Sequence, residues 1–314
     1  MPNIVLQTQN LTKTYDSLTA VKNLSLEVYE GEVFGFLGPN GAGKTTSINM
    51  MVGLLRPDDG YVTIRGQRVA NGSDHIRARV GVCPQDIVLW ERLTCLEQLQ
   101  FIGQMYGLSG HDARQCGEKL LVDLDLADKR RKQARTLSGG MQRRLNLAMA
   151  LVHDPEIVVL DEPEAGLDPQ SRVKVREYIQ SLARHKTVIL TTHNMDEADR
   201  VADRVAIIDH GELLVLDTPA ALKRQVGEGD VVEIQLSGQI DAGRIEQTLS
   251  ALADDVVVDE ERKQLTIRAL NAVGALPAIL TQLESIGVQP GEVRVRENTL
   301  EDVFIQLTGR RLRE

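Results

Sequence analysis

The most constraining feature of this 314-residue chain is a glycine-rich segment, Gly38–Thr46 (GPNGAGKTT), between a predicted strand and a predicted helix. It matches the pattern G-x-x-x-x-G-K-[ST], whose glycines let the backbone wrap closely around phosphates. The backbone N–H groups and the positive end of the following helix then face the negative charge. Lys44 is expected to reach the β- and γ-phosphate oxygens, and Thr45 to offer its hydroxyl to Mg²⁺. In this strand–loop–helix setting the segment predicts a nucleotide site rather than an ordinary glycine-rich turn.

The first 220 or so residues alternate short β-branched runs with helical stretches, which is typical of an α/β fold with helices flanking a mixed or parallel sheet. The predicted strands are Glu32–Leu37, Val80–Cys83, Ile157–Leu160, Thr187–Leu190 and Val205–Ile208. The predicted helices are Lys44–Leu55, Cys95–Tyr106, Gly140–Val152, Pro169–Arg184 and Met195–Ala202.

Two acids, Asp161 and Glu162, directly follow the apolar strand Ile157–Leu160. The carboxyl ends of strands in an open α/β sheet are where ligands bind. Asp161 suits the acid that helps to hold Mg²⁺, and Glu162 can face the attacking water as polariser or general base. Alone, the pair could equally mark a strand that emerges into solvent; beside a phosphate loop it indicates a catalytic site.

A second anion-facing segment is Leu137–Gln142 (LSGGMQ), which stands at the start of a predicted helix. Together with the loop at 38–45 and the acids of 157–162, it resembles the ATP-binding cassette (ABC) ATPases over about residues 1–220. The resemblance implies a P-loop NTPase (ABC ATPase) domain with a mixed sheet and a helical subdomain. It also implies ATP and Mg²⁺ as cofactors and ATP hydrolysis as the activity.

The resemblance assigns nucleotide and metal contacts to positions in both segments. The implied ATP contacts are Tyr15, Gly38, Pro39, Asn40, Gly41, Ala42, Gly43, Lys44, Thr45, Thr46, Ser138, Gly139, Gly140 and Asp168. The implied Mg²⁺ ligands are Thr45, Gln85 and Asp161. Tyr15 would stack on adenine, although a half-buried strand tyrosine is the alternative interpretation.

The implied catalytic residues are Glu162, Gln85 and His193. Gln85 resembles the glutamine that touches Mg²⁺ and the attacking water, with an ordinary surface glutamine as the alternative. His193 resembles the histidine that senses the γ-phosphate, with a structural histidine as the alternative. The chain departs from the family at Glu164, where most relatives have a small polar residue, and the sequence does not indicate the effect of this extra acid.

By the same resemblance, one chain cannot complete its own site. The LSGG segment of one subunit closes over ATP held by the phosphate loop of another, and the segment Ala165–Asp168 contacts the opposite subunit. We therefore expect a homodimer that is closed by two ATP molecules and released by hydrolysis.

After residue 222 the pattern changes, with a predicted junction at Gly227–Asp230. We expect a nucleotide-binding domain at 1–222 and a regulatory or dimerisation domain at 223–314. The predicted elements are a strand at 231–236, a helix at 242–253, strands at 256–259 and 264–268, a helix at 272–286 and a strand at 292–295. This β-α-β-β-α-β order indicates a small ferredoxin-like α+β domain. In Thr299–Leu307 the apolar residues Leu300, Val303, Phe304 and Leu307 have the spacing of one helix face, which predicts a helix that docks on a partner or on its own domain.

Composition limits the partners. With 36 Lys+Arg against 45 Asp+Glu, the net charge of -9 argues against nucleic acid and against anionic lipid. No run approaches the ~18 apolar residues that span a bilayer, so direct membrane insertion is not expected. The first twelve residues lack the basic and apolar parts of a secretory signal, and the three cysteines form no CxxC pair. We expect a protein on the cytoplasmic face of the membrane, bound to a separate permease.

The apolar segment Ile87–Trp90 is the predicted permease contact, with packing into the cassette's own core as the alternative. Thr299–Gly309 and Thr191–Ala198 are similar to segments of bacterial daunorubicin-resistance and polysaccharide-export ATPases, which favours export over import. A soluble ABC ATPase acting in iron-sulphur assembly, on ribosomes or on DNA stays open as the alternative.

Overall fold

The computed structural model describes residues 3–69, 76, 78–183, 185–226, 230–238, 240–250, 252, 255–260, 263–269 and 272–309. The chain divides into two compact units, and the second begins at Ala220. The expected boundary at residue 222 therefore lies inside helix α8 (Pro219–Gln225). Of the expected junction at 227–230, residues 227–229 lie outside the described residues.

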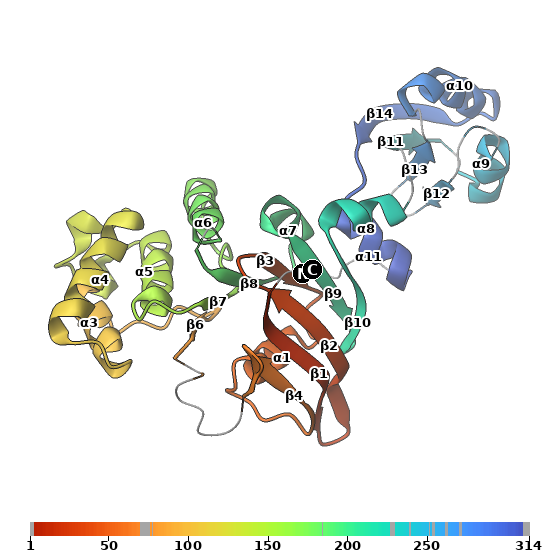
Figure 1. The fold of residues 1–314 in the computed structure, drawn as a ribbon. Helices are drawn as coiled ribbons and strands as arrows, with labels where there is room; N and C mark the ends of the chain where they lie inside the picture. The colour runs from red at the N-terminus through yellow and green to blue at the C-terminus, as the bar shows by residue number, and fades with distance from the viewer. Residues whose placement is uncertain are drawn as a thin grey trace. The chain divides into compact units, whose positions relative to one another are not determined.

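The first unit is built on a six-stranded sheet in the order β10-β9-β3-β8-β7-β6 (Figure 1). Strands β9, β3, β8, β7 and β6 run parallel, and β10 is antiparallel to β9. The strands are β3 (Val33–Leu37), β6 (Val80–Cys83), β7 (Ile157–Asp161), β8 (Thr187–Thr192), β9 (Arg204–Asp209) and β10 (Glu212–Asp217). Because β3, β7 and β8 are parallel neighbours, the segments that follow them meet at one edge of the sheet.

A second, antiparallel sheet in the order β2-β1-β4-β5 was not among the sequence predictions. Its strands are β1 (Ile4–Tyr15), β2 (Leu18–Tyr29), β4 (Asp59–Ile64) and β5 (Gln67–Arg68). The pairing of β1 with β2 shifts register at four points, so the apolar residues of these strands do not alternate regularly. That irregularity hides the period of two by which a half-buried strand is recognised.

Two apolar clusters enclose the six-stranded sheet. Along β7, Ile157 and Val159 pack toward the antiparallel sheet and α1, whereas Val158 and Leu160 pack toward the helices on the other face. This alternation places buried apolar residues on both faces of the strand, which accounts for its continuous apolar sequence. The prediction of a mixed sheet flanked by helices is confirmed.

The helices of the first unit begin close to the predicted residues. They are α1 (Lys44–Met51), α3 (Cys95–Met105), α4 (Gly110–Asp123), α5 (Gly139–Leu151), α6 (Pro169–Leu182) and α7 (Met195–Val201). The prediction that the first helix reaches Leu55 is wrong, because Gly53 adopts a φ of 74° and ends the helix. The expected end of another helix at residue 184 lies outside the described residues. Helices α3, α4 and α5 pack on one another and form the helical subdomain (Figure 1).

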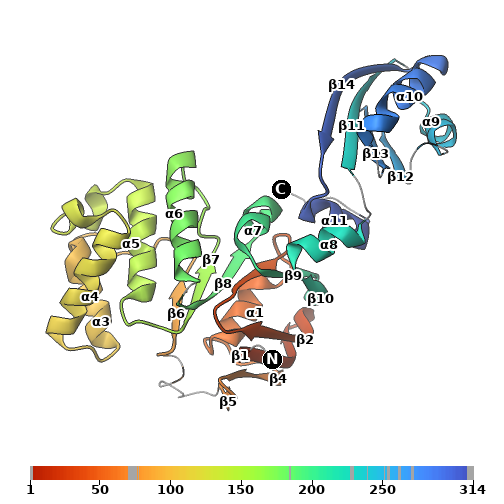
Figure 2. The same cartoon turned by 45° about the horizontal axis from the view of Figure 1, so that its top comes forward.

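The second unit begins with α8, which was not predicted, and then has the predicted order of strands and helices. Its elements are α8, β11 (Asp230–Ser237), α9 (Ala242–Leu249), β12 (Asp255–Asp259), β13 (Gln264–Ala269), α10 (Ala272–Ser285), β14 (Gln289–Arg296) and α11 (Leu300–Thr308). The antiparallel sheet has the order β12-β13-β11-β14, as in the split β-α-β arrangement, and α9 and α10 cover one face (Figure 2). The expected helix end at residue 253 lies outside the described residues.

The predicted terminal helix is confirmed as α11. A capping box formed by Thr299 and Asp302 begins the helix, and Arg296 holds the Asp302 carboxylate at 2.6 and 3.0 Å. Val303 and Phe304 are buried, but Leu307 is exposed, so only part of the apolar stripe is covered. Among the described residues, no helix has the length and apolarity required to cross a bilayer.

Candidate active site

The phosphate loop connects the fully buried strand β3 to α1. Gly41 and Gly43 have φ values of 82° and 98°, which disfavour any residue with a Cβ. A Cβ at Gly43 would also lie 2.4 Å from the carbonyl oxygen of Ala20. Gly43 caps α1 without a side-chain hydrogen bond, and the first turn holds no acid. The first N–H groups of α1 are therefore available to an anion from outside the chain.

Lys44 points back into this loop. Its Nζ donates to the carbonyl oxygens of Gly38 at 2.6 Å and Pro39 at 3.2 Å. Burial lowers the pKa of Lys44, while the nearby carboxylates of Glu162 and Asp161 act in the opposite direction. The ammonium group is thus held against the carbonyl oxygens at the start of the phosphate loop.

Glu162 is the centre of a hydrogen-bonded group of three predicted residues. Gln85 Nε2 donates to Glu162 Oε2 at 3.1 Å, and His193 Nδ1 lies 2.7 Å from Glu162 Oε1. The side chain of Glu162 is buried, and its φ of 46° is unusual for a residue with a Cβ. Backbone strain of this kind persists only where the surrounding structure enforces it, and it concentrates at functional sites.

The oxygens that could hold Mg²⁺ come from the end of β7, the segment after β6 and the start of α1. Asp161 accepts a hydrogen bond from the Thr191 hydroxyl on the neighbouring strand, and Thr45 is exposed in the first turn of α1. Because Gln85 uses its amide nitrogen on Glu162, its amide oxygen is left for a cation. Mg²⁺ favours a few oxygen ligands of this kind beside phosphate and water. The donor set therefore fits the ion.

The remaining predicted ATP contacts belong to other elements than the phosphate loop. Ser138–Gly140 begin α5, which Figures 1 and 2 both show on the opposite side of the unit from α1. Gly140 does approach the start of α6, where an added Cβ would lie 2.5 Å from Ser171 Oγ. Asp168 caps α6 by accepting from the backbone N–H groups of Gln170 and Ser171. Tyr15 ends β1 and is 46% exposed, so stacking on adenine stays a prediction beside the interpretation as a half-buried strand tyrosine.

The acid at Glu164 has a partner that the sequence did not reveal. It is buried and makes a two-point ion pair with Arg176 of α6, at 2.7 and 3.0 Å. A second buried acid, Glu197 of α7, is close enough to Glu164 to be affected by its charge. Glu197 accepts a hydrogen bond of 2.6 Å from the Thr192 hydroxyl. Burial raises the pKa of Glu197 to about 7, and the neighbouring carboxylates of Glu164 and Glu162 add to that shift. The charge of Glu164 itself is balanced by Arg176, because the two side chains form a two-point ion pair.

A functional candidate that sequence reasoning missed is Arg143 of α5. Its side chain is 3% exposed and donates to carbonyl oxygens that follow β6 and end β7. In a sequence, a charged residue on a helix is usually interpreted as a solvated side chain. Its position five residues after Ser138 was the only available signal.

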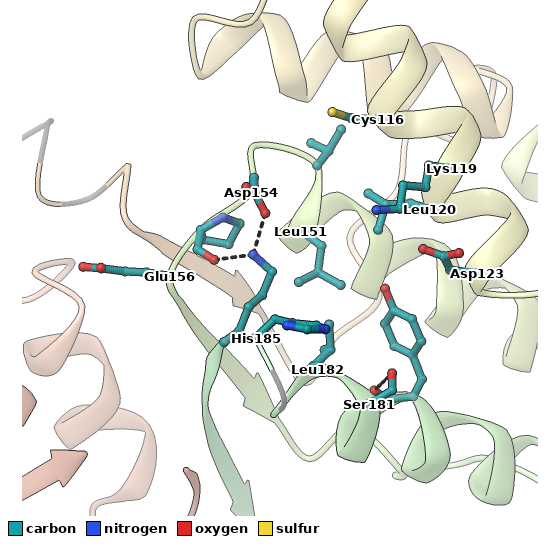
Figure 3. Close-up of a pocket in the computed structure, with 14 residues that line it drawn as sticks. Cys116, Lys119, Leu120, Asp123, Leu151, Asp154, Glu156, Ser181, Leu182 and His185 are labelled. Atoms are coloured by element: carbon teal, nitrogen blue, oxygen red, sulfur yellow. Dashed lines mark hydrogen bonds and ion pairs between the residues drawn. The ribbon is translucent and has the colours of Figure 1, made fainter. Parts of the chain in front are cut away.

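A cavity of about 830 Å³ lies elsewhere in the first unit, between α4, α6 and the segment that follows α5 (Figure 3). Leu120, Leu151 and Leu182 contribute apolar lining, and Lys186 binds Asp154 at 2.6 Å along one wall. None of the predicted site residues lines it. The cavity is therefore distinct from the phosphate-loop site.

The sequence is similar to proteins of known families. A sequence profile described as ABC transporter matches residues 21–165. The chain is 36% identical to the linearmycin resistance ATP-binding protein LnrL of Bacillus subtilis, over 99% of this chain and 100% of that protein. It is 37% identical to the daunorubicin resistance ATP-binding protein DrrA3 of Streptomyces coeruleorubidus, over 100% and 99%. It is 38% identical to the Nod factor export ATP-binding protein I of Burkholderia lata, over 100% of each.

Solved structures agree with these relatives. The structure of an ATP-binding subunit of an ABC transporter matches with a TM-score of 0.65 at 28% identity, over 70% of this chain and 92% of that one. A dimeric ATP-binding cassette in a post-hydrolysis state, bound to ADP and Pi, matches with a TM-score of 0.63 at 28% identity, over 68% and 98%. The predicted ABC ATPase fold is confirmed. The chain belongs to the ABC transporter family as an ATP-binding protein that hydrolyses ATP.

Proposed function

We propose that this chain is the ATP-hydrolysing subunit of an exporter, in which two copies sandwich two ATP molecules and drive a separate membrane permease. The observation that carries the proposal is the separation of α1 and α5 within one chain (Figures 1 and 2). The N-terminus of each helix is suited to bind an anion. A second copy is the simplest source of the missing surface. Export is supported by the name of one relative that matches along its full length, the Nod factor export ATP-binding protein I. Two other full-length relatives are named for resistance to linearmycin and daunorubicin, which export would explain.

In this proposal Glu162 polarises the attacking water and accepts its proton. The oxygen of the water bonds to the γ-phosphorus as the bond to the bridging β-phosphate oxygen breaks, which yields ADP and phosphate. An ionised Glu162 can only accept hydrogen bonds, so His193 must carry its proton on Nδ1. Gln85 Nε2 and His193 Nδ1 then hold the two carboxylate oxygens in place. Bound Mg²⁺ would offset phosphate charge, held by Thr45, Asp161 and Gln85.

The proposed permease contact is a set of exposed apolar side chains on α3 and on the segment before it, which we call the α3 patch (Ile87, Val88, Trp90, Phe101 and Met105). Trp90 and Phe101 are 42% and 45% exposed, and their rings meet edge to face at 5.2 Å. Leu89, in contrast, packs against the helix-side core. Exposed aromatic clusters of this kind commonly anchor protein interfaces. Such docking supports a peripheral location on the cytoplasmic face.

The second unit is proposed to be a regulatory or dimer-stabilising domain. The proposed boundary between it and the nucleotide-binding domain lies at about residue 222. The three relatives that match along their full length extend through this unit as well as the cassette. Its apolar cluster is formed by its own strands and helices. Removal of residues 223–314 is therefore expected to leave ATP binding by the cassette in place.

One experiment tests the dimer and the role of Glu162 together. Glu162→Gln removes the proton acceptor but keeps the side-chain shape, so turnover should fall by about 100- to 10,000-fold. With ATP the variant should accumulate as a dimer, measured by light scattering. Glu177→Gln, at an exposed position on α6, is the matched control and should behave as wild type. Near-normal turnover, or a monomer saturated with ATP, contradicts the proposal.

A second experiment tests the permease. A tagged full-length chain should retain a multi-span membrane protein during purification from detergent-solubilised membranes. Trp90→Asp in the α3 patch should abolish this retention and leave the ATP affinity unchanged. Recovery of only a soluble complex would instead support an ABC ATPase that acts in iron-sulphur assembly, on ribosomes or on DNA.

A further inference from the structure

The guanidinium group of Arg143 uses all five of its N–H donors on backbone carbonyl oxygens. Nη1 donates to Pro84 O at 2.6 Å and Gln85 O at 2.8 Å. Nη2 donates to Asp161 O at 2.7 Å and Glu162 O at 2.8 Å, and Nε donates to Pro163 O at 3.2 Å. The guanidinium fork is rigid and planar, so five simultaneous hydrogen bonds fix the acceptors relative to one another.

This arrangement is unusual because Arg143 forms no ion pair among the described residues. A buried charge is costly unless polar groups compensate it. Here the carbonyl dipoles that end two neighbouring parallel strands, β6 and β7, take the place of a carboxylate. These carbonyl oxygens stabilise the positive charge, and the shared guanidinium group links the segment after β6 to the segment after β7.

The two segments carry the side chains that meet at the site. Gln85 lies on the segment after β6 and Glu162 on the segment after β7, and their side chains are hydrogen-bonded at 3.1 Å. Hydrogen bonds on both sides hold the strained backbone of Glu162. Its N–H donates to Thr191 O at 3.0 Å, and its carbonyl oxygen accepts from Arg143 at 2.8 Å and from Ala165 N at 3.1 Å.

We propose that Arg143 is a positioning residue for ATP hydrolysis. From α5, the helix that begins with Ser138–Gly140, it holds the backbones of Gln85 and Glu162 in the relative position that hydrolysis requires. The inference rests on the roles proposed above for Gln85 and Glu162. Arg143 touches neither the phosphate loop nor Lys44, so it affects the chemical step and not the affinity for ATP.

The next residue provides a matched control. Arg144 lies on the same helix, is 7% exposed, and also donates to carbonyl oxygens. Its acceptors are Leu124 O at 2.7 Å, Asp125 O at 3.2 Å and Gly140 O at 3.4 Å, all within the helical subdomain. Unlike Arg143, it also pairs with a carboxylate, that of Asp125, at 3.4 Å. Loss of Arg144 therefore removes a comparable buried guanidinium group without touching the segments of Gln85 and Glu162.

The experiment compares Arg143→Met and Arg143→Lys with Arg144→Met in the full-length chain. Both Arg143 variants should lose kcat by about 100-fold, because misplacement of a catalytic group by about 1 Å has effects of that size. Lysine keeps the charge but has three donors at one point, so it cannot bridge both strands. The KM for ATP and the ATP affinity measured by calorimetry should change by less than about threefold. Arg144→Met should keep kcat within about threefold.

Several results would overturn the inference. They are a wild-type kcat in either Arg143 variant, an equal loss of kcat in Arg144→Met, or a loss of ATP affinity that parallels the loss of kcat. If Arg143→Met does not fold, Arg143→Lys carries the test, with calorimetric ATP binding as proof of folding. Glu162→Gln separates the two proposals. Normal turnover in Glu162→Gln refutes the proposed function, whereas an inactive Glu162→Gln beside a fully active Arg143→Lys refutes only the role of Arg143.

Discussion

Helices α1 and α6 differ in how their first backbone N–H groups are satisfied. At α6, the Asp168 carboxylate accepts from Gln170 N at 3.1 Å and Ser171 N at 3.0 Å. At α1, Gly43 supplies no side-chain acceptor. Helix α5 is intermediate, because Ser138 Oγ accepts from Met141 N only at 3.4 Å. A capped helix end serves the fold, whereas an open one is available to an anion.

The difference teaches how the ATP site is divided. The open end at α1 belongs to the phosphate loop, and the weakly capped end at α5 belongs to the segment proposed to receive ATP from a second copy. The well-capped end of α6 is committed to its own chain, although Asp168 was predicted as an ATP contact. That contact stays a prediction, and it would have to form while the carboxylate also caps α6.

The largest effect on ATP affinity is expected from removing the cation beside the open end of α1. Lys44→Ala eliminates a charge-assisted hydrogen bond to phosphate, which contributes ~1.5–3 kcal/mol and corresponds to a loss of ATP affinity of about 10- to 150-fold. Calorimetric titration with ATP measures it. Lys223→Ala, in the second unit, is the control and should bind as wild type. An unchanged affinity in Lys44→Ala would show that the phosphates do not reach this ammonium group.

A smaller effect is expected from closing the open end of α1. Thr46 is the third residue of the helix, where a glutamate can fold back to the first N–H groups as in a capping box. Thr46→Glu should stabilise the nucleotide-free protein by ~0.3–1 kcal/mol, since an acid favours the positive helix end. The same charge repels phosphate, so ATP affinity should fall while the unfolding temperature rises. Thr46→Gln is the neutral control, and a rise in both quantities would contradict the comparison.

The sequence could predict the parts of this site that rest on local pattern. The phosphate loop, the strand that ends at Asp161, and the helix start at Lys44 follow from glycine spacing and apolar runs, and the structure has them within a residue or two. Sheet β2-β1-β4-β5 and helix α4 were missed. Of the 14 residues of α4, only Ala113, Gly117 and Leu121 are buried, so its apolar face is too narrow to recognise.

The contacts between segments could not be predicted, because they depend on tertiary folding. Arg143 meets carbonyl oxygens 18 to 59 positions away in the sequence, and backbone carbonyls leave no trace in the side-chain pattern. The same holds for Arg176, whose ion pair with Glu164 spans 12 residues. Glu162 was predicted from its place after a strand, but its left-handed backbone was not.

A modest effect on stability is expected from opening the end of α6. The hydrogen bonds from Ser171 hold the pKa of Asp168 below its usual value of 3.8. A lowered pKa means that Asp168 stabilises the fold above about pH 4, and that this contribution disappears as the pH falls through the folded value. Asp168→Ala should therefore lower the unfolding midpoint by about 2–4 °C at pH 7 and by less near pH 3. Asp168→Asn keeps the cap, and an equal loss in both variants would show that the cap is not the cause.

The smallest effect on stability is expected at α5, and it decides whether the weak cap has a second purpose. Ser138→Ala removes a hydrogen bond of 3.4 Å, so it should cost less than about 0.5 kcal/mol in the free energy of unfolding. Ser109→Ala is the matched control, because Ser109 caps α4 at 3.1 Å and also binds Asp112 at 2.7 Å. In a Glu162→Gln background, Ser138→Ala should weaken ATP-dependent dimerisation measured by light scattering, whereas Ser109→Ala should lower stability more and leave the dimer intact. If Ser109→Ala weakens the dimer as much, stability controls assembly; if only Ser138→Ala does, the hydroxyl at the start of α5 is reserved for ATP on the second copy.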